Sequence, residues 1–334
     1  MNFSRYLTVS VLAAVLCLPF AGAQAKTVIE VAHTQMETHP DHIALLAFKD
    51  YVERHAGDIY EVQIFPNKKA GTNEQVIDLL RAGSIQFMVI SSANLEPYNR
   101  KYSIFSIPYL FSSEDEYEKF ITDPKVLEEL ATKNEEDGFT PLVAFTAGSR
   151  SFYAKSPIST PDDLKGKTFR IQSGRTNKDM MEFFNANEMT ISFGEVYSAL
   201  KKGLIDGAEN NELALVEQKH GEFCKYYSYD HHQMIPDLLV GSTVFLYSIP
   251  EKDFEIFRQA ALEAQEVEFA MWENSIKKAK KSAQQLGVEF LEVNVDDFRK
   301  KVAPIHEYLL KTRPEIKELY DKARAIGAQE TEKK

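Results

Sequence analysis

Arg150 and Arg170 are the residues of this chain whose type and placement best suit binding chemistry. Arg150 follows an apolar run that ends at Thr146, and Arg170 lies inside the short alternating strand predicted for 168–171. A guanidinium group presents a planar fork of donors that matches a carboxylate or sulfonate, so two such groups in one cleft would form an anion site. The amide of Asn210 closes the same stretch of chain. The alternative is that each arginine faces solvent in a surface ion pair worth about 0–1 kcal/mol.

Three sequence motifs occur in order around these residues. They are Gly148-Ser149-Arg150, then PISTPDDLKGKTFR at 157–170, then FGEVYSAL at 193–200 continued by GLIDGAEN at 203–210. In this order they resemble the central signature of the solute-binding subunits of tripartite ATP-independent periplasmic (TRAP) transporters, the DctP-type receptors. LRAGSI at 80–85 and IPYLF at 107–111 resemble the first-domain motifs of that family. The resemblance therefore covers nearly the whole mature chain.

This resemblance implies a fold and a set of site residues. The fold would be α/β, a two-domain periplasmic binding protein of the Venus-flytrap type, with a long helix spanning both domains. In that family the arginine matching Arg170 makes the main salt bridge to the acid group of the ligand. The residues matching Arg150 and Asn210 complete the polar site, and the ring of Phe193 would form a wall of it.

The first third of the chain alternates between strands and helices. We predict strands at 27–32, 60–65 and 85–90, with helices at 43–55 and 73–82 between them. Short connections in this order indicate a mostly parallel sheet, whose ligands bind at the carboxyl ends of the strands. Those ends hold His33, Thr72 and Ser91, which we therefore predict as ligand-binding residues. His33 has the alternative of being a capped strand end.

The chain begins with the features of a secretory signal. A short positively charged start, an apolar run at 7–18 and an Ala23-Gln24-Ala25 cleavage site predict a signal peptide at 1–25. Cys17 would leave with it, and Cys224 alone cannot form an intramolecular disulfide. Export without disulfides indicates the bacterial periplasm and a fold stabilised by its core.

The mature length favours two domains. We predict that domain I comprises 26–147 and 236–275, that domain II comprises 148–235 and 276–327, and that 328–334 is a disordered tail. The apolar segment 238–247 is expected to be a buried strand that crosses back to domain I. The segment 251–286 lacks glycine and proline and resembles the long helix of the family; the alternative is two helices with a kink near Glu273-Asn274.

Composition excludes several classes of partner and site. The formal net charge of −11 argues against binding to nucleic acid or to anionic membranes. We find no phosphate-binding or dinucleotide-binding motif and expect no cofactor. His231-His232 is the one candidate metal pair, but neighbours in a strand point to opposite faces, so we expect no metal site.

We therefore predict a monomeric solute-binding subunit that captures a small organic acid or sulfonate anion and delivers it to TRAP membrane permease subunits. The ligand itself is left open among sugar acids, dicarboxylates, hydroxy or oxo acids and sulfonates. We expect no enzymatic activity, since His33 and Cys224, the candidate base and nucleophile, have no recognisable partners. A periplasmic enzyme acting on organic acids and a sensor subunit that presents ligand to a signalling partner are the alternatives.

Overall fold

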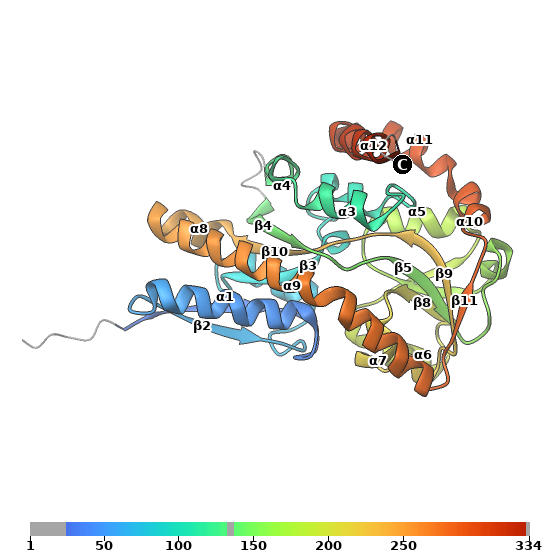
Figure 1. The fold of residues 1–334 in the computed structure, drawn as a ribbon, viewed down its shortest axis with the longest axis horizontal. Coiled ribbons are helices and arrows are strands. Elements are labelled where there is room, and N and C mark those ends of the chain that lie inside the picture. The colour runs from blue at the N-terminus through green and yellow to red at the C-terminus, as the bar shows by residue number, and fades with distance from the viewer. Residues whose placement is uncertain (1–24, 132–136, 332–334) are drawn as a thin grey trace, which may run out of the picture.

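The structure, a computed structural model, describes residues 25–131 and 137–331. Its strands form two β-sheets, each covered by helices, and one long helix runs past both sheets (Figure 1). The predicted signal peptide lies outside the described residues apart from residue 25. Within the described residues, no helix has the length and apolar content needed to cross a bilayer.

The first sheet has the strand order β2-β1-β3-β10-β4. Its strands are β1 (Thr27–Ala32), β2 (Tyr60–Phe65), β3 (Phe87–Ser91), β4 (Phe139–Phe145) and β10 (Asp237–Ser242). The strand β1 pairs in parallel with both β2 and β3, and the helices α1 (Pro40–Ala56) and α2 (Asn73–Arg81) connect them. The parallel pairing predicted for the first three strands is confirmed, and it requires such crossover helices.

The second sheet has the order β11-β9-β5-β8-β6-β7. Its strands are β5 (Arg150–Ala154), β6 (Thr168–Ile171), β7 (Asn187–Thr190), β8 (Gly207–Asn210), β9 (Tyr226–Gln233) and β11 (Glu289–Glu292). The chain passes from the first sheet to the second between β4 and β5, and it returns between β9 and β10. These two passages bring the edges of the sheets near one another.

The remaining helices complete the layers around the sheets. The α-helices are α3 (Glu114–Ile121), α4 (Pro124–Ala131), α5 (Arg175–Phe183), α6 (Val196–Lys202), α7 (Leu213–Glu217), α8 (Thr243–Ser248), α9 (Glu251–Gln285), α10 (Val295–Val302), α11 (Pro304–Thr312) and α12 (Lys317–Thr331). Short 3₁₀ helices are η1 (Ser92–Asn94), η2 (Arg100–Ser106), η4 (Pro161–Leu164), η5 (Phe193–Glu195), η6 (His220–Glu222) and η7 (Pro314–Ile316). The helix α12 continues through Thr331 into the segment predicted as a disordered tail, and residues 332–334 lie outside the described part of the chain.

The helix α9 is one continuous helix rather than two, and it contributes to the cores of both sheets (Figure 1). Phe257 and Ala264 belong to the apolar cluster that also contains residues of α1 and of the first sheet. Ala283, near the other end of α9, belongs to the cluster beneath the second sheet. The predicted helix that spans both parts of the molecule is confirmed.

The strand predicted at 238–247 is wrong in its second half. The strand β10 ends at Ser242, and α8 begins at Thr243. The side chain of Ser242 accepts a hydrogen bond from the backbone N–H of Phe245 and so caps the helix. A run of apolar residues does not distinguish a buried strand from a buried helix, which is why the pattern missed this boundary.

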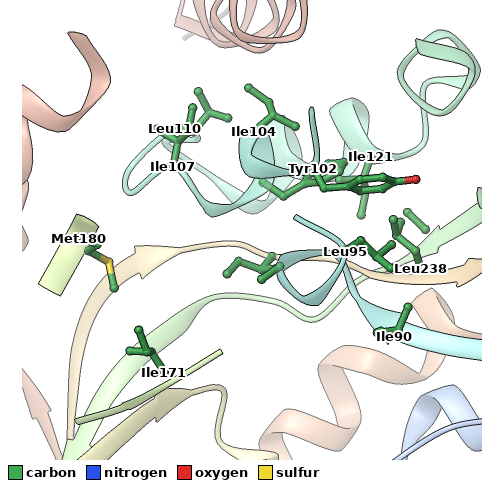
Figure 2. Close-up of a cluster of buried hydrophobic side chains, with 14 of the residues drawn as sticks. Ile90, Leu95, Tyr102, Ile104, Ile107, Leu110, Ile121, Ile171, Met180 and Leu238 are labelled. Atoms are coloured by element: carbon green, nitrogen blue, oxygen red, sulfur yellow. The ribbon is translucent and has the colours of Figure 1, made fainter. Parts of the chain in front are cut away.

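A large apolar cluster joins the two sides of the molecule (Figure 2). Ile90 and Leu238 lie on strands of the first sheet, whereas Ile171 and Met180 come from β6 and α5 on the second-sheet side. Burial of apolar surface contributes about 25 cal/mol per Å². Separating the sheets at this cluster would expose such surface, so the two sides stay packed here.

Arg313, which precedes η7, adds ion pairs across the same junction. Its Nη1 lies 2.8 Å from Glu96 Oε1, and its Nη2 lies 3.0 Å from Asp179 Oδ2. Glu96 follows η1 on the first-sheet side, and Asp179 lies on α5 on the second-sheet side. All three side chains are buried, so this arginine balances two carboxylates away from water.

We expect Arg313→Met to lower the free energy of unfolding by about 3–5 kcal/mol, because it would leave Glu96 buried without a counter-charge and Asp179 with only the exposed Arg175. Urea denaturation of purified protein measures this. The matched control is Arg175→Met, since Arg175 also binds Asp179 but is 58% exposed. It should cost less than about 1 kcal/mol. Equal losses in the two variants would contradict the role of Arg313.

Candidate functional site

A cavity lined by residues of both sheets lies between them. The first-sheet side contributes polar lining residues that include Gln35, His39, Asp41, Asn73, Ser91, Asn94 and Asp237. The second-sheet side contributes Arg150, Arg170, Gln172, Phe193, Asn210 and Glu217. A ligand in this cavity would therefore contact both sides of the molecule.

The order of the strands explains why three of the predicted residues meet. In the second sheet β8 lies between β5 and β6, parallel to β6 and antiparallel to β5. The carboxyl ends of β6 and β8 therefore share one edge with the amino end of β5, and this edge carries Arg170, Asn210 and Arg150. Gly148 leads into β5 with φ 56°, and a Cβ there would lie 2.8 Å from Trp272 Nε1, so the turn requires glycine.

Arg150 is already neutralised by the protein. Its Nε and Nη2 donate to the two carboxylate oxygens of Glu209 at 2.6 and 3.0 Å, which is a bidentate pair. Burial alone would raise the pKa of Glu209, but the adjacent Arg150 guanidinium lowers it to about 2. Arg150 is 3% and Glu209 is 1% exposed. The sequence predicts two guanidinium groups in one cleft, and in the structure Glu209 supplies the counter-charge of one of them, Arg150.

The ion pair continues into a buried chain of alternating charges. His232 Nε2 lies 3.6 Å from Glu209 Oε2, an ion-pair contact too long for a hydrogen bond. The other ring nitrogen, Nδ1, is hydrogen-bonded to Asp230 Oδ2 at 2.8 Å. Burial opposes the charged imidazole, but the Asp230 carboxylate raises the pKa of His232 to about 9. Arg150, Glu209, His232 and Asp230 together carry no net charge.

Arg170 is buried without such compensation. It is 4% exposed, and no carboxylate of the described residues is in ion-pair contact with it. Its Nε donates to the backbone oxygen of Ile191 at 3.1 Å, and its Cζ lies 5.6 Å from the centre of the Phe193 ring. Burial lowers the pKa of Arg170, yet an arginine side chain stays protonated in proteins. The cavity therefore holds an unbalanced positive charge.

Asn210 is oriented by its neighbours. Its Oδ1 accepts from Arg150 Nη1 at 3.0 Å and from the backbone N–H of Asn211 at 2.8 Å. Since both contacts are donors, the carboxamide oxygen faces them and the NH₂ group remains available as a donor. The neutralised Arg150 thus positions Asn210 beside the charged Arg170.

The first-sheet residues predicted from the sequence lie in different places. Ser91 lines the cavity at the end of β3, whereas His33 and Thr72 are not among its lining residues. His33 is buried with its Nε2 3.0 Å from His42 Nδ1. Thr72 caps the amino end of α2 through its hydrogen bond with Gln75. The ligand-binding roles of all seven predicted residues, Arg150, Arg170, Asn210, Phe193, His33, Thr72 and Ser91, stay predictions.

Sequence reasoning missed the acidic and amide side chains that complete the lining. Asp41 lies in the first turn of α1, Asp237 begins β10 and Gln172 directly follows β6. Asp237 pairs in register with Ser91 across β10 and β3, so the two reach the same edge of the first sheet. This pairing joins segments far apart in the chain, and only the polar residue types at element ends signalled it.

The candidate catalytic and metal residues lie apart from this cavity. Cys224 is buried in the apolar cluster of the second sheet, and burial raises the pKa of its thiol to about 12. His231 is exposed beside Ser149, whereas His232 is buried in the charge chain. Within residues 25–131 and 137–331, no group of three or more histidine, cysteine or acidic side chains is arranged to hold a metal ion.

Comparisons of sequence and structure relate this chain to known solute-binding proteins. The sequence profile of bacterial extracellular solute-binding protein, family 7, matches residues 31–312. A solved TRAP periplasmic solute binding protein of Anaerococcus prevotii, with bound α/β D-glucuronate, is 39% identical with a TM-score of 0.89 and covers 91% of this chain and 99% of its own. An uncharacterized protein of Salmonella typhimurium is 32% identical over 90% of this chain and 92% of its own length. A C4-dicarboxylate-binding periplasmic protein of Vibrio cholerae is 30% identical over 67% of each chain.

The charge of His232 in this buried chain predicts how the stability of the protein depends on pH. Because the pKa of His232 is raised from 6.5 to about 9 on folding, its stabilising contribution is complete below pH 6.5 and is lost as the pH rises through 9. We expect the difference in unfolding free energy between wild type and His232→Gln to shrink between pH 6.5 and pH 10. The change should be on the order of 3 kcal/mol, since a pKa difference of one corresponds to about 1.4 kcal/mol. Urea denaturation across this range measures it.

His220→Gln is the control for this series. Burial lowers the pKa of His220 to about 3, so its imidazole is neutral throughout the range. The difference between wild type and His220→Gln should change by less than about 0.5 kcal/mol over the same range. A His232 series as flat as the His220 series would show that His232 is neutral in the folded protein.

Proposed function

Since the chain belongs to the bacterial extracellular solute-binding protein family 7, the solute-binding proteins of TRAP transporters, we propose that it captures a small organic acid anion in the periplasm. It then delivers this anion to the TRAP permease subunits in the membrane, acting as a monomer. The predicted signal peptide supports the periplasmic location.

The unbalanced charge of Arg170 is the observation that carries this proposal. A buried ion without a partner is costly, and a protein normally pairs it or coordinates it. The guanidinium of Arg170 meets no carboxylate of the described residues, and it lines the cavity between the two sheets. An anionic ligand supplies the missing counter-charge. Arg170, with the NH₂ group of Asn210 beside it, would hold one carboxylate.

The contacts at Arg170 supply part of the binding energy. A hydrogen bond to a charged group contributes about 1.5–3 kcal/mol, and micromolar affinity requires about 8 kcal/mol after the costs of association, so contacts with the body of the ligand must supply the rest. The related structure from Anaerococcus prevotii holds a sugar acid, and the Vibrio cholerae relative is named for a C4-dicarboxylate. Both ligands carry the carboxylate that Arg170 would bind.

Contacts between the two sides of the cavity support closure around the ligand. Thr38 Oγ1 donates to Glu217 Oε1 at 2.8 Å, and Ser173 Oγ donates to Asn94 Oδ1 at 3.0 Å. In each pair one residue belongs to the first-sheet side and the other to the second. A ligand favours the closed form through its contacts with both sides. We propose that these contacts and the ligand stabilise the same state.

The side chains predicted as base and nucleophile do not line the cavity. A hydrolase or lyase would need such a group at the ligand, and the titratable groups His39, Asp41 and Asp237 that do line it interact with one another. The raised pKa of Cys224 disfavours the thiolate, and neither Cys224 nor His33 is among the lining residues. Incubation of bound acids with the protein should therefore return them unchanged in mass.

We expect Arg170→Lys to bind a carboxylate ligand about tenfold or more weakly, because a lysine keeps the charge but loses the bidentate fork. Arg170→Ala should bind more weakly still. In the absence of ligand the alanine variant should unfold within about 1 kcal/mol of wild type or above it, since the change removes a buried charge without a protein partner. Isothermal titration calorimetry and urea denaturation measure the two effects. Wild-type affinity in Arg170→Lys would place the anion site elsewhere.

Replacement of Arg150 provides the contrast. Arg150→Met leaves Glu209 buried without its bidentate partner, so we expect a loss of about 3 kcal/mol or more in unfolding free energy. Ligand affinity should fall less than in Arg170→Ala, because the charge of Arg150 is already balanced. If Arg150→Met leaves stability unchanged and abolishes binding, the two arginines have exchanged roles.

A further inference from the structure

Several side chains that line the cavity carry buried polar atoms with no hydrogen-bond partner among the described residues. These residues are Asp41, Asn73, Ser91, Gln172, Glu217 and Gln218. In all but Gln218 the unpartnered atom is an oxygen that accepts hydrogen bonds. Buried polar groups of native proteins normally have partners. This lining therefore suits a ligand that donates hydrogen bonds to these oxygens.

The acceptor oxygens without partners favour a ligand with hydroxyl groups over a dicarboxylate. Hydroxyl groups supply O–H donors, whereas an ionised carboxylate only accepts hydrogen bonds. Gln172 is 6% exposed, and its Oε1 has no donor within the described residues. Leaving such a group unpaired costs its full desolvation. A dicarboxylate would bind Arg170 with one end but could not satisfy Gln172 or Asp41 with the other.

Two carboxyl groups on the first-sheet side, those of Asp41 and Asp237, also need hydrogen-bond donors from a ligand. Asp41 is fully buried, and neither of its oxygens accepts a hydrogen bond from a donor of the described residues. His39 Nδ1 lies 3.4 Å from Asp41 Oδ1 in an ion-pair contact. The Asp237 carboxyl lies within hydrogen-bonding reach of Asp41, so a proton shared between them would occupy one Asp41 oxygen and leave the other as an acceptor. Asp41 and Asp237 both line the cavity.

The charges of the side chains around the cavity can be balanced by one ligand carboxylate. Burial opposes the charged form of His39, but Asp41 raises its pKa to about 9, so the imidazolium balances one carboxylate. Burial and the neighbouring Asp41 raise the pKa of Asp237, which favours its protonated form. Arg170 then remains the one unbalanced cation that we find in the described lining. A second carboxylate on the ligand would meet Asp41 and Asp237 instead of a cation.

We propose that Asp41 and Asp237, together with Gln172, form a subsite that accepts hydrogen bonds from hydroxyl groups on the body of the ligand. The protein thereby selects polyhydroxy monocarboxylates, the class of uronates and aldonates, and rejects dicarboxylates. This inference rests on the proposed function, since it takes the ligand carboxylate to be held at Arg170.

Calorimetric titration with four acids separates the contributions. D-glucuronate and D-gluconate carry one carboxylate and several hydroxyls. Cyclohexanecarboxylate keeps a six-membered ring and a carboxylate but has no hydroxyl, and succinate has a second carboxylate. We expect at least one of the hydroxylated acids to bind wild type at least 100-fold more tightly than either of the other two.

Asp41→Asn and Asp237→Asn test the subsite itself. The measured quantity is the ratio of the affinity for the preferred hydroxy acid to the affinity for succinate. Partial loss of folded protein lowers both affinities equally and so leaves this ratio unchanged. Asp41→Asn removes the negative charge that accepts from hydroxyl groups and repels a second carboxylate, so the ratio should fall at least tenfold. Asp237→Asn replaces a carboxyl acceptor by an amide, so the ratio should fall by a smaller factor. Asp253→Asn is the matched control, because Asp253 is equally buried but binds Tyr60 Oη outside the cavity. It should leave the ratio unchanged.

Arg170→Ala distinguishes the subsite from the anion site. If wild type prefers succinate, or if the ratio is the same in wild type and both aspartate variants, the hydroxyl subsite is overturned. In that event, binding that is lost in Arg170→Ala still supports the proposed function. If wild type binds none of the four acids, this inference is overturned, whereas the proposed function still stands if another organic acid binds wild type and not Arg170→Ala.

Discussion

The bidentate ion pair between Arg150 and Glu209 is the interaction on which the candidate site depends. It gives a buried arginine a full counter-charge, and His232 and Asp230 extend the pair into a neutral chain. The same arginine fixes the carboxamide of Asn210 with its donor group free. Arg170, one strand further along the sheet, receives no such partner from the described residues. The protein thus separates a structural arginine from one whose charge remains available.

The frame around this site holds one junction firmly and brings two polar edges together. The apolar cluster of Ile90, Leu238, Ile171 and Met180, with the ion pairs of Arg313, joins the two sides of the molecule. The helix α9 adds packing along both cores. In contrast, the cavity edges meet through a few polar contacts such as that of Thr38 with Glu217. Loss of a few hydrogen bonds costs far less than exposure of a core, so opening is easiest at the cavity.

Local pattern and the family resemblance were enough to predict the parallel strands at the start of the chain and the length of α9. Hydrophobic periodicity and the family resemblance carry that information. The neutralisation of Arg150 was not predictable, because Glu209 becomes its partner only through the antiparallel pairing of β5 with β8. Asp41 and Asp237 were not predicted as site residues for the same reason, because Asp237 reaches the cavity only when β10 pairs with β3. The α8 boundary was missed because apolar content is the same in a buried strand and a buried helix.

The overall charge of the protein and the charge of its cavity have opposite consequences for an anion. A formal net charge of −11 repels anions at long range, so the surface does not concentrate them. At an ionic strength of about 0.15 M this repulsion is largely screened beyond roughly 8 Å. Attraction then acts only inside the cavity, where Arg170 is shielded from water and from screening ions. In the site that we propose, selectivity would be decided after entry, by whether one carboxylate reaches Arg170 while the rest of the ligand brings donors to Asp41, Asp237 and Gln172.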